Sequence, residues 1–181
     1  MNPIFPPGSG GFLNPERIVN LLPEIKEGDV IADFGCGHGY FAIPIAKKVG
    51  SQGKVFALDI LEKALEATRS KARLEGVENI ETIRCNLEKN STLADESVDV
   101  VLIANLLFQT EDDEGVIREA KRVLKKGGKI IVIDWKKDSP LGPKGKRVSE
   151  DEVKNLMQKE GLSFVRDFET DRFHFGMIFE K

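Results

Sequence analysis

The sequence is poor in cysteine, in net charge and in long apolar runs, and each scarcity excludes a class of protein. Two cysteines among 181 residues, Cys36 and Cys85, are too few for a disulfide framework or a thiolate zinc site, so we expect no metal. The 27 basic residues are outnumbered by 30 acidic ones, whereas a general nucleic-acid binder is usually basic. We therefore expect no nucleic-acid partner.

Apolar residues never form a stretch long enough to cross a bilayer. The longest run, Val100 to Phe108, includes Asn105 and falls far short of the ~20 residues that a membrane helix needs. The first basic residue is Arg17, and proline and glycine interrupt the segment before it, which is not the pattern of a signal peptide. We interpret the protein as cytoplasmic, without a membrane partner.

Strand-like and helical patterns alternate along the chain, which is typical of an α/β protein. Short apolar runs predict strands at 30–34, 54–59, 80–85, 98–105 and 129–134. Periodic or capped stretches predict helices at 15–22, 40–49, 62–75 and 112–125, and a further helix that begins after Ser149 and ends near Gly161. Two closing strands, 163–168 and 173–179, are joined by a short polar turn and are predicted to be antiparallel.

These elements predict one domain over residues 1–181, with a Rossmann-like, doubly wound sheet. We expect seven strands, mostly parallel with one antiparallel strand, and helices on both faces. Residues 1–13 are rich in proline and glycine and are predicted to be a flexible arm, which either closes as a lid or stays disordered. The twelve polar residues between Cys85 and Val98 predict a loop or one helical turn instead of a crossover helix.

A glycine-rich loop, Asp33 to Gly39 (DFGCGHG), lies between the first of these strands and the following helix. Glycine lets the backbone approach a ligand closely, often with a positive φ. Asp59 ends the next strand, about twenty residues later, where an acid can accept hydrogen bonds from ribose hydroxyls. Loop and acid together predict an adenosine-containing ligand. The alternative is a tightly packed loop, with Asp59 merely capping the next helix.

The glycine spacing separates the candidate ligands. A dinucleotide fingerprint has its third glycine three residues after the second, and here that position is Tyr40, with the glycine one residue early at Gly39. No Gly-Lys-Ser/Thr sequence follows, which excludes a P-loop. The spacing therefore counts against a nicotinamide dinucleotide.

The DFGCGHG segment resembles the D-x-G-x-G-x-G motif of class I S-adenosylmethionine-dependent methyltransferases. The resemblance extends through most of the chain. Arg122 to Gly128 (RVLKKGG) is similar to the family's R-V-L-K-P-G-G turn, with Lys126 in place of proline. The nearest branch is that of the ubiquinone/menaquinone-biosynthesis-like small-molecule methyltransferases. The resemblance implies S-adenosyl-L-methionine as cofactor and a small-molecule methyl acceptor.

The same resemblance implies which residues bind the cofactor. Asp59 matches the ribose-binding acid, and Asn86 and Leu87 lie where the family contacts the adenine, with Asn86 replacing the usual aspartate. An amide both donates and accepts, so adenine binding is retained, in a pocket that the short linker leaves more open. The expected cofactor-binding residues are Asp33, Gly35, Cys36, Gly37, Gly39, Asp59, Ile60, Asn86, Leu87 and Asn105.

No catalytic residue is identified from the sequence, although three residues are candidates. Asp134 and Trp135 end the fifth predicted strand. In one interpretation Asp134 is a general base and Trp135 a platform for the acceptor. In the other, Asp134 is a capping residue and Trp135 packs in the protein. His38 contacts either the ligand or solvent. His174, in the last strand, is expected at the surface or at an edge. The basic residues between 136 and 147 either attract an anionic acceptor or are simply solvated.

Methyl transfer to a small molecule requires mainly that the protein align the acceptor and exclude water. Two alternatives stay open. One is an NAD-dependent oxidoreductase, which the glycine spacing and the lack of room for a substrate domain oppose. The other is a non-catalytic S-adenosylmethionine-binding module. The acceptor, any general base and the oligomeric state do not follow from the sequence.

Overall fold

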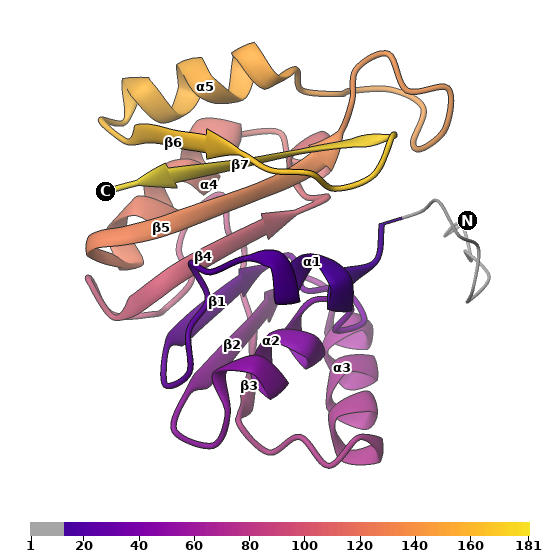
Figure 1. Ribbon diagram of the computed structural model, residues 1–181, viewed down its shortest axis with the longest axis vertical. Helices are drawn as coiled ribbons and strands as arrows, with labels where there is room; N and C mark the ends of the chain where they lie inside the picture. The colour runs from indigo at the N-terminus through magenta and orange to yellow at the C-terminus, as the bar shows by residue number, and fades with distance from the viewer. Residues whose placement is uncertain (1–12) are drawn as a thin grey trace.

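A computed structural model describes residues 13–181 of the protein (Figure 1). Its strands are β1 (Val30–Phe34), β2 (Lys54–Asp59), β3 (Ile80–Arg84), β4 (Val98–Ala104), β5 (Leu124–Trp135), β6 (Ser163–Asp167) and β7 (His174–Glu180). Its helices are α1 (Pro15–Leu21), α2 (Ala42–Val49), α3 (Glu62–Leu74), α4 (Asp113–Val123) and α5 (Glu150–Lys159), with a 3₁₀ turn, η1 (Leu107–Gln109). None of the helices in this part of the chain has the length and hydropathy of a bilayer-spanning segment.

The seven strands of residues 13–181 form one sheet in the order β3-β2-β1-β4-β5-β7-β6 (Figure 1). Strands β1 to β5 are parallel to one another, and β7 is antiparallel to both β5 and β6. This confirms the prediction of a Rossmann-like, mostly parallel sheet with one antiparallel strand. The carboxyl ends of β1, β2, β4 and β5 therefore share one edge, which is where ligands of such sheets bind.

Two apolar cores, one on each face of the sheet, explain why the central strand is almost entirely apolar. Val100 and Leu102 of β4 pack in the core with α1, α2 and α3, whereas Val101 and Ile103 pack in the core with α4 and α5. Successive side chains of a strand point to opposite faces, so a strand covered on both sides has apolar residues at every position.

The helix ends follow local capping signals. Asn14 accepts a hydrogen bond from the backbone N–H of Arg17 at the start of α1. Ser149 and Glu152 form the predicted capping box of α5. Of the predicted arm, residues 1–12 lie outside the described residues, and the half-buried Leu13 packs against the core beside α1.

The largest boundary errors are at the helix predicted at 112–125 and the strand predicted at 129–134, and tertiary pairing explains them; the other predicted ends lie within two residues of those observed. The helix predicted to extend to 125 ends at Val123, and β5 begins at Leu124, which pairs with Val98 of β4. Residues 125–128 then bulge from the ladder before pairing resumes at Lys129. Pairing with β4 therefore overrides the helical propensity of the lysines. The helix predicted at 40–49 begins at Ala42, after the turn that completes the glycine loop.

Candidate functional site

The three glycines of the loop after β1 all have positive φ, but for different steric reasons. A β-carbon on Gly35 would lie 2.8 Å from Cδ1 of Leu106, and one on Gly39 would lie 3.1 Å from the side chain of Thr68. A β-carbon on Gly37, where φ is +52°, would meet no described atom within 4 Å. Gly35 and Gly39 thus allow close packing, whereas Gly37 faces open space.

Asp59, at the end of β2, holds this loop from the neighbouring strand. Its Oδ2 accepts a hydrogen bond from the backbone N–H of Gly37 and its Oδ1 accepts one from Leu61, both at 2.9 Å. Each oxygen of an ionised carboxylate can accept more than one hydrogen bond, so the half-buried side chain retains capacity for a ligand's hydroxyl groups.

Asp33 of β1 is buried beneath the loop, and its carboxylate is only partly satisfied. The residue is 1% exposed, and Oδ2 has no hydrogen-bond partner among the described residues. Burial and, to a smaller extent, the charge of Asp59 together raise the pKa of Asp33 to about 7, against a hydrogen bond from the Ala42 N–H. A buried acceptor without a partner is costly, so a donor brought by a ligand would be stabilised here.

Cys36 and Ile60 lie in the same region in opposite environments. Cys36 is buried, and burial together with the nearby charges of Asp33 and Asp59 raises the pKa of its thiol, which stays neutral and packs as an apolar group. Ile60 follows Asp59 and is 54% exposed, which leaves it free to contact a ligand at this edge.

Asn86 and Leu87 follow β3, directly beside the end of β2. The N–H of Cys85 donates to the carbonyl of Asp59, which brings the two strand ends together. Asn86 is half-buried, and its Oδ1 accepts a hydrogen bond from the N–H of Glu88 at 3.0 Å. Leu87 is buried in the core on the α4 side. The expected ribose and adenine residues therefore lie side by side.

The turn after β4 is organised by Asp134 at the end of β5. Oδ2 of Asp134 accepts from Leu107 N–H at 3.1 Å and Oδ1 accepts from Trp135 N–H at 2.7 Å. Burial raises the pKa of Asp134 to about 7, against the hydrogen bonds from these amides. These contacts match the capping interpretation, and its role as a general base stays a prediction. Asn105 has φ +53° and a buried Oδ1 that no described donor contacts.

Trp135 packs against His174, the residue that pairs with it across β5 and β7. Their ring centroids are 4.0 Å apart, and the backbone of Gly142 lies so close to the indole that a β-carbon there would collide with it. The prediction that His174 lies at the surface is wrong, because it is 2% exposed. Antiparallel pairing with β5 places β7 inside the sheet, so its first residue is covered.

Asp171 is a residue of this region that the sequence reasoning missed. Its Oδ1 lies 2.9 Å from Nδ1 of His174 and also accepts the backbone N–H groups of Phe173 and His174. Burial lowers the pKa of His174, although Asp171 opposes this, so the imidazole is favoured in its neutral form. Nε2 is buried without a partner in the described part of the chain. The spacing Asp-x-x-His in a polar turn is the signal that could have identified this pair.

The basic segment from 136 to 147 is partly engaged within the protein itself. Lys146 contacts both carboxylate oxygens of Asp113 and the carbonyl of Thr110. Arg147 donates to the carbonyl oxygens of four residues in its own loop, which are Lys136, Ser139, Leu141 and Pro143. Arg147 therefore shapes the loop that covers Trp135. His38 is exposed, which agrees with the interpretation that it faces solvent.

Comparison with known proteins identifies relatives across most of the chain. The family model described as a methyltransferase domain matches residues 25–173. A demethylmenaquinone methyltransferase of Lactococcus lactis is 35% identical over 141 residues, which cover 75% of this chain and 53% of that protein. A ubiquinone/menaquinone biosynthesis C-methyltransferase of Haemophilus ducreyi is 30% identical over 150 residues, covering 82% and 57%. The chain thus spans a little over half the length of these relatives.

A solved structure agrees over nearly the whole length of both chains. The crystal structure of a SAM-dependent methyltransferase from Aquifex aeolicus has a TM-score of 0.84 and 28% sequence identity, and the match covers 93% of this chain and 89% of that one. The fold described above therefore also occurs in that methyltransferase.

Proposed function

The chain belongs to the methyltransferase domain family, and from this membership we propose that it is a class I S-adenosylmethionine-dependent methyltransferase acting on a small-molecule acceptor. The observation that carries the proposal is the open space in front of Gly37, bordered by the Asp59 carboxylate that holds the loop. The alternative of a nicotinamide-dependent oxidoreductase has no comparable support.

The described residues fit S-adenosylmethionine. Gly37 leaves room for the ligand, and the carboxylate of Asp59 retains acceptor capacity for ribose hydroxyls. The unpartnered Oδ2 of Asp33 suits the ammonium group of the methionine portion, because a buried carboxylate is stabilised by a charged donor. Asn86 would offer its side-chain amide to the base. The predicted cofactor contacts of Cys36, Ile60, Leu87 and Asn105 stay predictions.

When bound, the cofactor supplies a methyl group on a sulfonium, which is already a strong electrophile. The residues of this chain have the remaining tasks of aligning the acceptor and excluding water. Trp135 and Leu107 are both buried beside the ends of β4 and β5, where they pack as apolar groups within the protein. Asp134 ties the turn after β4 to the end of β5, because its carboxylate accepts hydrogen bonds from the backbone N–H groups of Leu107 and Trp135.

We propose that the acceptor is a flat, apolar molecule of the quinone type. The names of the relatives from Lactococcus lactis and Haemophilus ducreyi support this class. The slightly negative net charge favours a small molecule over a nucleic acid. The two free cysteines, Cys36 and Cys85, suit the reducing cytoplasm, where we place the protein.

Calorimetry with three ligands tests the cofactor. S-adenosylmethionine and S-adenosylhomocysteine should bind, and NAD should bind weakly or not at all. Comparable affinity for NAD would overturn the proposal. An assay with methyl-labelled cofactor and a reduced short-chain demethylmenaquinone then tests turnover. Cofactor binding without methylation of this or any other acceptor in a small-molecule panel would favour the non-catalytic binding module.

A further inference from the structure

The segment between β3 and β4, residues 86–97, is docked on α4. As predicted, it forms no crossover helix, and its ordering comes from hydrogen bonds instead. Its first half is a tight turn, in which the N–H groups of Lys89 and Asn90 both donate to the carbonyl of Asn86 at 3.0 Å. Its last residues are tied to the end of α4, because Glu96 and Ser97 donate to the carbonyls of Arg122 and Val123.

One face of α4 makes the contacts with this segment. Gly115, Glu119 and Arg122 are four and three positions apart, a spacing that places them on the same side of a helix. At Gly115 a β-carbon would collide with the carbonyl of Glu88, so the helix and the segment approach backbone to backbone. The next two positions on this face carry opposite charges.

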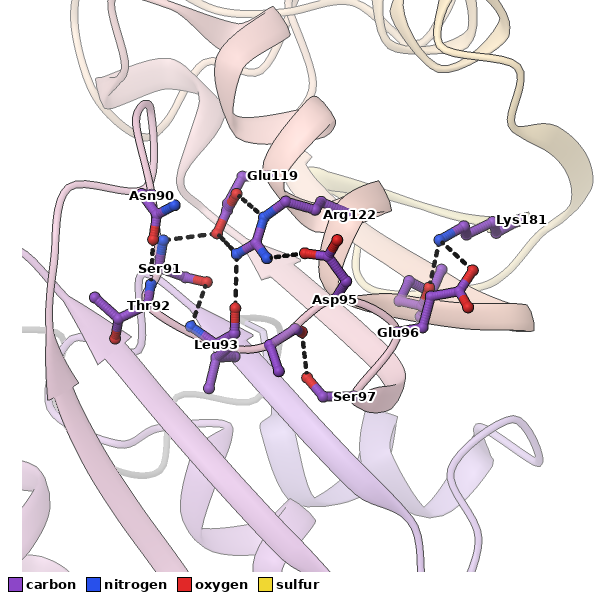
Figure 2. Close-up of polar contacts among 12 residues, drawn as sticks. Asn90, Ser91, Thr92, Leu93, Asp95, Glu96, Ser97, Glu119, Arg122 and Lys181 are labelled. Atoms are coloured by element: carbon purple, nitrogen blue, oxygen red, sulfur yellow. Dashed lines mark hydrogen bonds and ion pairs between the residues drawn. The ribbon is translucent and has the colours of Figure 1, made fainter.

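Glu119 and Arg122 form a clamp that holds the middle of the segment (Figure 2). The guanidinium of Arg122 binds both carboxylate oxygens of Glu119, at 2.6 and 2.8 Å. Oε1 of Glu119 accepts the N–H of Ser91 at 2.6 Å, and Nη2 of Arg122 donates to the carbonyl of Leu93 at 2.8 Å. Arg122 also pairs with Asp95. Figure 2 shows the charged pair directed at the backbone of the segment. Because the segment is not helical, its backbone N–H and C=O groups need such partners from outside the segment.

The carboxylate of the clamp is buried, so its charge depends on hydrogen-bond partners within the protein. Glu119 is 4% exposed. Although burial opposes ionisation, hydrogen bonds from Arg122 and Ser91 hold the pKa of Glu119 below its usual range. Loss of Arg122 would therefore release the segment and leave the buried carboxylate of Glu119 without its charged partner.

The held segment begins with the residues expected at the adenine. Ser91, which Glu119 holds, directly follows Asn90, and Asn90 is bonded back to Asn86. Leu87 packs in the same core as Val116 and Ala120 of α4. The position of Asn86 and Leu87 is therefore set from α4.

We propose that Glu119 and Arg122 are positioning residues, which lie outside the ligand site and give it selectivity for the adenine base by holding Asn86 and Leu87 in place. This inference rests on the proposed function, because it assumes an S-adenosyl ligand. A residue that merely stabilises the fold would change the affinity for every ligand of the site equally. A residue that positions Asn86 and Leu87 would instead change the relative affinity for ligands that differ in the base.

The test measures the affinity ratio of two ligands that differ only in the base. Calorimetry with S-adenosylhomocysteine and S-inosylhomocysteine reports this ratio, which we expect to be about tenfold in the unaltered protein, the value of one well-placed hydrogen bond. Arg122→Met should reduce the ratio to near one, mainly by weakening the adenosyl ligand. Arg122→Lys keeps the charge without the bidentate geometry and should give an intermediate ratio, which is also the readout if Arg122→Met does not fold.

Arg118→Met is the matched control, because Arg118 lies on α4 but is exposed and faces Glu160 instead of the segment. Its ratio should equal that of the unaltered protein. An unchanged ratio in the Arg122 variants, or an equal loss in Arg118→Met, would overturn the inference, as would equal binding of both ligands by the unaltered protein. Failure of the unaltered protein to bind S-adenosylhomocysteine would instead refute the proposed function.

Discussion

The carboxylate of Asp59 accepts a hydrogen bond from the backbone N–H of Gly37, with 2.9 Å between Oδ2 and N. The last residue of β2 thus holds the middle of the loop that follows β1. The loop and the acid, recognised separately in the sequence, form one structural unit. Changes on either side of this bond affect both the shape of the loop and the surface offered to a ligand.

Replacement of Asp59 by alanine should weaken S-adenosylhomocysteine binding by about tenfold to a hundredfold. The loss corresponds to charge-assisted hydrogen bonds of roughly 1.5–3 kcal/mol. Isothermal titration calorimetry measures it. Glu81→Ala is the control, because Glu81 is an exposed acid on the neighbouring strand β3, paired with Lys54. Affinity within a factor of two of the unaltered protein would mean that Asp59 only caps its own turn.

A methyl group at position 37 should abolish ligand binding at little structural cost. Gly37→Ala meets no described atom, so its destabilisation is limited to the positive φ, about 1–2 kcal/mol. Gly76→Ala is the control, because Gly76, after α3, has a similarly positive φ and no described atom within 4 Å of a β-carbon. Both variants should lose similar thermal stability, but only Gly37→Ala should lose S-adenosylhomocysteine affinity. Normal binding by Gly37→Ala would show that the ligand lies elsewhere.

Asp33→Asn should change how stability depends on pH. The folded-state pKa of Asp33 is raised to about 7 from an ordinary value of 3.8, so the folded protein binds more protons than the unfolded chain between those values. Stability attributable to this group therefore falls as pH rises through that window, and asparagine removes the effect. The difference can reach on the order of 4 kcal/mol.

Urea unfolding of both proteins at pH 5 and pH 8 measures this difference. The stability of Asp33→Asn relative to the unaltered protein should increase toward pH 8, while its affinity for S-adenosylhomocysteine decreases. Asp134, whose pKa is also raised to about 7, is present in both proteins and cancels from the comparison. Parallel stability curves at the two pH values would contradict the prediction.

The loop over Trp135 offers an optical test, because this is the protein's single tryptophan. Gly142→Ala places a β-carbon against the indole ring and should lift the loop, shifting the fluorescence emission to longer wavelength. Gly145→Ala has a similarly positive φ but meets no described atom within 4 Å. Its emission should match that of the unaltered protein. Identical spectra for both variants would show that Gly142 does not determine how the ring is covered.

Local features of the fold and the site were predictable, because each depends on residues close in sequence. The apolar run of β4, the capping box at Ser149 and Glu152, and the glycine loop all have short-range signatures. Even the place of Asp59 follows from a single strand–helix–strand unit. The predicted cofactor residues therefore gather at one edge of the sheet.

Features that depend on distant partners were not predictable from the sequence. Leu124 begins a strand because Val98 lies beside it, and His174 is buried because β7 pairs with β5. The role of Glu119 is hidden for the same reason, since its hydrogen bond to Ser91 spans 28 positions. A charged residue in an amphipathic helix is indistinguishable from a solvated one until the opposing segment is placed.

The position of β7 between β5 and β6 has a consequence for biosynthesis. Within residues 13–181, β6 has β7 as its neighbour in the sheet, yet it leaves the ribosome first. Until residues 174–180 emerge, the nascent chain carries β5 with an unpaired edge, including the apolar Ile131 and Ile133, beside an unattached α5 and β6. Unpaired apolar edges are templates for aggregation. The interval before β7 has emerged is therefore one in which the nascent chain exposes an edge prone to aggregation.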